Sequence, residues 1–212
     1  MKKFLALMLV LILALPMMAS AVAESGQVVL SVGAAFTTFF NPYFQGTMIG
    51  YAFPCYEPLA WLHSANHEFE AVLAESWEVN KDECSLTIHV RDGVTFSDGD
   101  KMDANDVYFT LQSRLDFGTA STIGNPSKVE LVDDMTVKVY WDSFSLNYET
   151  WILPQYIFSK DAFEAHGGKD NGGIDWMCNN MLGTGPYIMK EFIPDVSLTF
   201  EKNPNYLDSI PF

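Results

Sequence analysis

The sequence predicts an α+β fold. Short runs with alternating apolar residues come in pairs around polar turns, which is the pattern of β-hairpins. Single amphipathic stretches with helical spacing separate these pairs. The regular strand–helix–strand alternation that a parallel sheet requires does not appear. We therefore expect antiparallel sheets with isolated helices packed against them.

Three hairpins are predicted. In the first, 76–79 and 85–90 flank a polar turn, and Leu86, Ile88 and Val90 share one face of the second strand. The second joins 128–132 to 135–141 through Asp133-Asp134, and the third joins 185–192 to 196–202 through residues 193–195. A short strand is also expected at 28–32, and the stretch 48–62 is consistent with a short helix leading into a strand.

Three helices are predicted between these hairpins. The first covers about 104–115, where Val107, Leu111 and Leu115 form an apolar stripe. The second lies within 147–153 and ends before Pro154. The third follows Ser159, its expected N-cap, and ends near Gly167. The Gly- and Asn-rich stretch between this helix and the third hairpin is predicted to be a linker.

The first residues have the layout of a secretory signal peptide. Lys2 and Lys3 precede an apolar run at 4–15, and small residues follow Pro16 up to Ala23, the predicted cleavage point. A membrane span needs about 20 apolar residues, and this run is shorter. The sequence therefore predicts a signal peptide over 1–23 and a mature chain that is exported.

The charge of the mature chain limits its partners. Removal of the signal peptide leaves 10 basic and 27 acidic residues, a net charge of −17. Binding to nucleic acid or to an anionic membrane requires a basic surface. We therefore expect no nucleic-acid partner.

Cysteines and histidines give no clear metal or redox site. Cys55, Cys84 and Cys178 are consistent with one disulfide plus a free thiol or with buried thiols, and their pairing stays open. His63 and His67 have the spacing of a helical metal pair, but their loop-like surroundings argue against a helix. No metal and no cofactor is expected.

The acidic stretch at 91–106 allows three interpretations. A calcium loop of the EF-hand type fails in every frame, because hydrophobic or misplaced residues occupy ligand positions. A paired-carboxylate hydrolase stays open, since one sequence cannot show the distance between two acids. The third interpretation is structural: Asp98 and the glycines form turns, and Asp103 with Asp106 forms a capping box at the start of a helix.

Three motifs in order resemble a known family. The central one is LAESWEVNKDECSLTIHVRDGVTFSDGDKMDANDVYFTL, preceded by CYEPLAWL and followed by LGTGPYIMKEFIPDVSLTFEKNPNY. Together they resemble the extracellular solute-binding proteins of peptide-type ABC importers, bacterial solute-binding protein family 5. The resemblance covers nearly the whole mature chain, although Lys101-Met102 replaces a Pro-containing pair of the family.

The resemblance implies a periplasmic-binding-protein-like fold of type II, with an α/β lobe and an inserted, mainly β domain. By analogy, 24–50 and 183–212 form part of lobe one, and 51–182 form the inserted smaller domain. Family members are much longer, so the sequence is expected to be an N-terminal fragment without the second, ligand-closing lobe. Such a truncated chain is expected to bind weakly alone.

The resemblance also implies a function. Family members are not enzymes; they capture a peptide or another small solute in the periplasm or at the outer face of the cytoplasmic membrane and deliver it to an ABC permease. Relatives carry peptides, nickel chelates, sugars or opines, so the ligand stays open. A secreted acidic hydrolase with paired carboxylates is the alternative.

The resemblance places the lobe-one part of the ligand cleft after the first strand. The candidate ligand-binding residues, one continuous segment, are Thr37, Thr38, Phe39, Phe40, Asn41 and Pro42. Core packing is an equal alternative for the two phenylalanines, whereas the polar residues favour ligand contact. The segment 183–187 is interpreted as structural.

Overall fold

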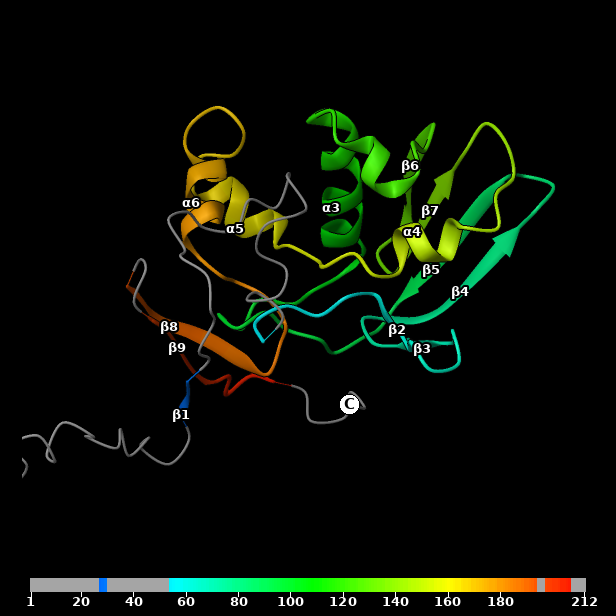
Figure 1. Ribbon diagram of the computed structural model, residues 1–212. Coiled ribbons are helices and arrows are strands. Elements are labelled where there is room, and N and C mark those ends of the chain that lie inside the picture. The colour runs from blue at the N-terminus through cyan, green and yellow to red at the C-terminus, as the bar shows by residue number, and fades with distance from the viewer. Residues whose placement is uncertain (1–26, 30–53, 194–196, 207–212) are drawn as a thin grey trace, which may run out of the picture.

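The computed structural model describes residues 27–29, 54–193 and 197–206. Figure 1 shows a larger α/β unit with a smaller sheet below its helices. The strands are β1 (Gln27–Val29), β2 (Ala60–Leu62), β3 (Phe69–Ala71), β4 (Ala74–Asn80), β5 (Ser85–Val90), β6 (Lys128–Asp133), β7 (Thr136–Tyr140), β8 (Tyr187–Ile193) and β9 (Ser197–Lys202). The helices are α3 (Ala104–Asp116), the 3-10 helix η2 (Ala120–Ile123), α4 (Tyr148–Ile152), α5 (Lys160–Ala165) and α6 (Gly173–Asn179).

An antiparallel four-stranded sheet in the order β4-β5-β7-β6 forms the larger unit. Its inner face carries the alternating residues that the sequence predicted, among them Leu86, Ile88, Val137 and Val139, all fully buried. Helix α3 packs against β6 and β7 and contributes Val107 and Leu111 to this core. The first two hairpins and this helix are therefore confirmed.

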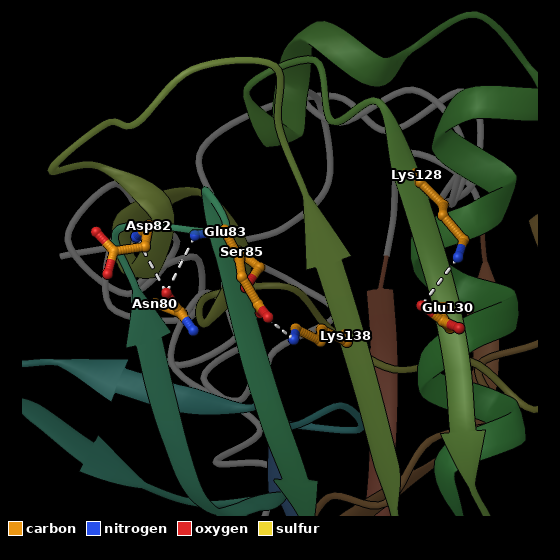
Figure 2. A network of polar contacts seen from close by, with 7 residues as sticks. All are labelled: Asn80, Asp82, Glu83, Ser85, Lys128, Glu130 and Lys138. Carbon is orange, nitrogen blue, oxygen red and sulfur yellow. Dashed lines mark hydrogen bonds and ion pairs between the residues drawn. The ribbon is translucent and has the colours of Figure 1, made fainter.

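The outer face of the same sheet is polar. Glu130 lies opposite Lys138 across β6 and β7, and Lys138 lies opposite Thr87 across β7 and β5. Figure 2 shows Lys138 paired with Glu83 and Lys128 paired with Glu130 on this face. Exposed ion pairs of this kind contribute little to stability, because water screens their charges. Their arrangement is that of a sheet with one face in the core and one in solvent.

A second, three-stranded sheet joins distant parts of the chain. Its order is β1-β9-β8, so the strand at Gln27–Val29 pairs antiparallel with Ser197–Lys202 near the other end. The third hairpin is thus confirmed, with residues 194–196 of its connection outside the described residues. The predicted strand at 28–32 is confirmed at 28 and 29, and its remainder also lies outside them.

The structure corrects three local predictions. The stretch predicted to be a linker contains α6, whose Trp176 stacks on His166 after α5 at a ring-centroid distance of 3.8 Å. Tertiary packing therefore overrides the loop-like composition. No helix is present at 54–59 before the predicted strand, while 48–53 lie outside the described residues. The segment 120–123, for which no element was predicted, forms the 3-10 helix.

Helices α4 and α5 agree with the prediction. Helix α4 ends before Pro154, and the Ser159 side chain caps α5 by accepting a hydrogen bond from the Ala162 amide. His63 and His67 lie in a turn between β2 and β3, as the sequence context indicated, and His63 Nε2 contacts Glu70 Oε2 at 2.6 Å.

Two buried side chains of α3 hold the segment that leads into α5. Thr110 is fully buried, and its hydroxyl accepts a hydrogen bond from the Phe158 amide at 3.0 Å. Asp106 is also buried, and its Oδ1 accepts from the Lys160 amide at 2.9 Å. These two bonds satisfy backbone groups that the three-strand and four-strand sheets do not reach.

We expect Thr110→Val to lower the free energy of unfolding by about 1–3 kcal/mol, because it leaves the buried Phe158 N–H without its acceptor. Ser113→Ala is the matched control: Ser113 is also buried on α3, but its hydroxyl donates only to the Thr110 carbonyl within the helix. Urea unfolding of both variants measures the difference. Equal losses would show that the Thr110 hydroxyl has no special role.

Candidate functional site

The predicted ligand-binding residues cannot be placed. Thr37, Thr38, Phe39, Phe40, Asn41 and Pro42 all lie outside the described residues, so the ligand-binding segment stays a prediction. The described part of the chain resumes at Pro54, so the site is described from the residues that follow.

The acidic stretch forms turns. Gly93 and Gly99 have φ angles of 80° and 97°, a region that glycine enters without the penalty of a side chain. Asp98 Oδ1 accepts a hydrogen bond from the Asp100 amide at 3.1 Å, an Asx turn. Lys101 Nζ lies 3.1 Å from Asp92 Oδ1, and this contact lowers the pKa of Asp92. Local backbone geometry therefore accounts for these acids.

The capping interpretation of Asp103 and Asp106 is confirmed. Asp103 Oδ1 accepts from the Asn105 amide at 2.7 Å, and Asp106 Oδ2 accepts from the Asp103 amide at 3.0 Å. Both halves of the capping box at the start of α3 are present. Burial raises the pKa of Asp106 to about 6, against the lowering effect of the amides of Lys160 and Asp103.

No cluster of metal ligands occurs in the described part of the chain: no three His, Cys, Asp or Glu side chains come together there. Within the same ranges, no helix has the length and apolarity needed to cross a membrane. Cys55 and Cys84 are free thiols, and burial raises the pKa of Cys55 to about 12. The side chain of Cys178 is not among those described.

Segments distant in sequence meet at one place, which we call the junction. It consists of 54–59, 95–99, 183–193 and 197–206. The Ser97 amide donates to the Gly183 carbonyl at 2.9 Å, and Asn205 Nδ2 donates to the Ser97 carbonyl at 3.1 Å. The Thr95 hydroxyl donates to the Asn205 carbonyl at 3.2 Å. The acidic stretch thus holds the segment that follows β9 against the larger unit.

Glycines allow a close backbone approach within the junction. A Cβ atom at Gly183 would lie 2.1 Å from the Cys55 carbonyl oxygen, and one at Gly185 would lie 2.7 Å from the Cys55 carbonyl carbon. The Gly185 amide donates to the Cys55 carbonyl at 2.9 Å, and the Tyr187 amide donates to the Pro54 carbonyl at 3.0 Å. These contacts support the structural interpretation of 183–187.

Glu57 is a buried carboxylate of the junction that turns and caps do not explain. It is 4% exposed, and its Oε1 accepts a hydrogen bond from the Tyr206 hydroxyl at 3.1 Å. Among the described residues, Glu57 Oε2 and the buried Thr184 Oγ1 have no hydrogen-bond partner. Burial raises the pKa of Glu57 to about 7. The Tyr206 hydroxyl, the charge of Arg91 and the Thr184 hydroxyl oppose this rise, although the Thr184 hydroxyl lies near Glu57 without the geometry of a hydrogen bond.

The sequence carried a signal for Glu57 that its interpretation did not use. Glu57 stands within CYEPLAWL, a run after Pro54 that is otherwise apolar, and an acid in such surroundings is a candidate for burial. The partners of Glu57 lie far along the chain, so their identity could not be read locally.

The pairing of the first strand with the last hairpin, around an intervening α+β unit, places the protein in the class of periplasmic-binding-protein-like folds of type II. The model of the bacterial extracellular solute-binding proteins, family 5 (middle), matches residues 68–211. The chain belongs to this family.

Individual relatives agree with this assignment. The chain is similar to di/tripeptide-binding protein 4 of Pseudomonas aeruginosa, with 30% identity over 66% of this chain and 30% of that protein. It is 25% identical to heme-binding protein A of Haemophilus influenzae over 71% of this chain and 31% of the relative. It thus spans about a third of the length of these curated relatives.

A solved structure shows the same fold. The dipeptide-binding protein of Pseudoalteromonas sp. SM9913 in complex with Met-Leu matches with a TM-score of 0.71 and 25% identity. The match covers 84% of this chain and 39% of that protein.

Asp103→Ala tests the capping role of the acidic stretch. We expect a loss of about 0.5–2 kcal/mol in the free energy of unfolding, because the first turn of α3 loses a side-chain acceptor. Solute affinity is expected to stay unchanged. Thermal unfolding and calorimetric titration measure the two quantities. Lower affinity at unchanged stability would contradict the capping role and indicate a binding site.

Proposed function

We propose that this chain serves as the substrate-binding component of an ABC importer. It captures a peptide or a similar small solute outside the cytoplasmic membrane and delivers it to the permease. The observation that carries the proposal is the family match over 68–211. The di/tripeptide-binding and dipeptide-binding relatives favour a short peptide as the ligand.

The proposal includes a domain organisation of the chain. Residues 1–23 direct export, 24–50 and 183–212 belong to lobe one, and 51–182 form the inserted smaller domain. The pairing of β1 with β9 supports a lobe built from discontinuous segments, because it brings Gln27–Val29 into one sheet with Ser197–Lys202.

The hydrolase alternative has no observation in its favour. Of the acids that suggested it, Asp98 stabilises a turn, and Asp103 and Asp106 cap a helix. The family match points to transport proteins, not to enzymes.

Native mass spectrometry of the protein purified from its own cells tests the proposal, with an added peptide panel as the measure of turnover. Co-purified short peptides that stay intact would support solute capture. Cleavage of the added peptides would overturn it in favour of the hydrolase.

Variants of the predicted ligand-binding segment test its role. We expect Thr38→Ala and Asn41→Ala each to weaken binding of the dipeptide Met-Leu by up to roughly tenfold, the effect of one lost hydrogen bond. The unfolding temperature should stay unchanged. Calorimetric titration gives the affinities.

Asp103→Ala is the control for these variants, since it is expected to lower stability and leave affinity intact. Unchanged affinity in both Thr38→Ala and Asn41→Ala would show that the segment does not contact the ligand.

A further inference from the structure

The junction contains a buried acid whose environment favours its neutral form. Glu57 is 4% exposed, and Thr184 beside it is 2% exposed. A charged carboxylate in such a place has lost its hydration, and this loss must be offset by donors or by an opposite charge. The hydrogen-bond donors and opposite charges near Glu57 therefore decide whether its carboxyl group is ionised.

The donors around Glu57 are few. The Tyr206 hydroxyl donates to Oε1, whereas Oε2 receives no hydrogen bond from any described residue. The nearby cation is Arg91, which lies directly after β5, and its Nε already donates to the Val72 carbonyl at 2.6 Å. Tyr206 and Arg91 are the titratable or charged groups that act on Glu57 from the packed segments.

The position of Glu57 makes its protonation state matter for the fold. Its bond to Tyr206 links 54–59 to the segment after β9, 149 residues further along the chain. The same segment is held by Asn203, whose amide donates to the Pro186 carbonyl and whose Nδ2 donates to the Gly185 carbonyl, each at 2.8 Å. The free-energy cost of ionising buried Glu57 therefore weakens a contact between distant parts of the chain.

We propose that Glu57 is a proton-dependent latch of the junction: the neutral carboxyl group holds 54–59 against 183–193 and 197–206, and ionisation weakens that contact. The hydrogen bond from the Tyr206 hydroxyl can form with neutral and with ionised Glu57. The two states therefore differ in stability because the ionised carboxylate carries a buried charge that its surroundings do not compensate. The proposal does not depend on the identity of the solute.

The direction of the pH dependence follows from the raised pKa of Glu57, from an ordinary value of 4.5 to about 7. In this window the closed junction binds more protons than an open one, so closure is strongest below pH 4.5 and is lost as the pH rises through 7. Asp106, with its pKa raised to about 6, acts in the same direction on global stability. A local measurement is therefore needed.

Amide hydrogen exchange of the full chain, corrected for the intrinsic exchange rate at each pH, measures the stability of the junction locally. The reporters are the amides of Gly185 and Tyr187, which donate to the carbonyls of Cys55 and Pro54 across the junction. We expect their protection to fall by on the order of tenfold between pH 5.5 and 8. In Glu57→Gln, which stays neutral, this pH dependence should disappear.

Glu75→Gln is the matched control, because Glu75 is exposed on β4 and should leave the pH dependence as it is. Tyr206→Phe removes the donor to Oε1 and should move the midpoint of the transition to higher pH, which keeps the proposal testable if Glu57→Gln does not fold. The same pH dependence in Glu57→Gln as in the unmodified chain would overturn the latch. An unshifted midpoint in Tyr206→Phe would do so as well.

Discussion

The arrangement of the described chain depends on one backbone contact, between Cys55 and the Gly183–Gly185 pair. A side chain at either glycine would overlap the Cys55 backbone, so only glycine allows these two segments of the backbone to lie this close together. The amide of Gly185 then bonds directly to the Cys55 carbonyl. This contact fixes where the β8–β9 hairpin lies relative to the four-stranded sheet.

Asparagine side chains extend that contact across the rest of the junction. Asn203 bonds to the Gly185 carbonyl, and Asn205 bonds to the Ser97 carbonyl. An amide side chain offers both donor and acceptor atoms, so it can satisfy backbone groups that lie outside any sheet. The acidic stretch takes part in the junction through the Ser97 backbone and the Thr95 hydroxyl. Its role in the described structure is to position a neighbouring segment.

The sequence predicted those parts of the fold whose signal is local. Alternating residues such as Leu86, Ile88 and Val90 report a half-buried strand, and the spacing of Val107 and Leu111 reports a helix face. Cap residues are equally local, since Asp103 and Asp106 contact each other within one turn. These predictions were correct because no distant contact was needed to make them.

The misses are the features that distant contacts create. Helix α6 begins at a Gly172 cap without a side-chain hydrogen bond, in a composition typical of loops, and it gains its support from the stack of Trp176 on His166. The burial of Glu57 likewise depends on Thr184 and Tyr206, which no local pattern connects to it. The predicted ligand-binding segment at 37–42 lies outside the described residues and stays a prediction.

The two buried carboxylates, Asp106 and Glu57, differ in how many hydrogen-bond donors they receive. Asp106 receives a backbone amide on each oxygen and lies at the start of α3, where the helix dipole favours a negative charge. Glu57 receives one hydroxyl group, and its second oxygen has no partner among the described residues. Burial raises the pKa of both groups, that of Asp106 to about 6 and that of Glu57 to about 7. Two backbone amides hold the Asp106 carboxylate in place when it is ionised, whereas ionised Glu57 has a hydrogen bond on one oxygen alone among the described residues.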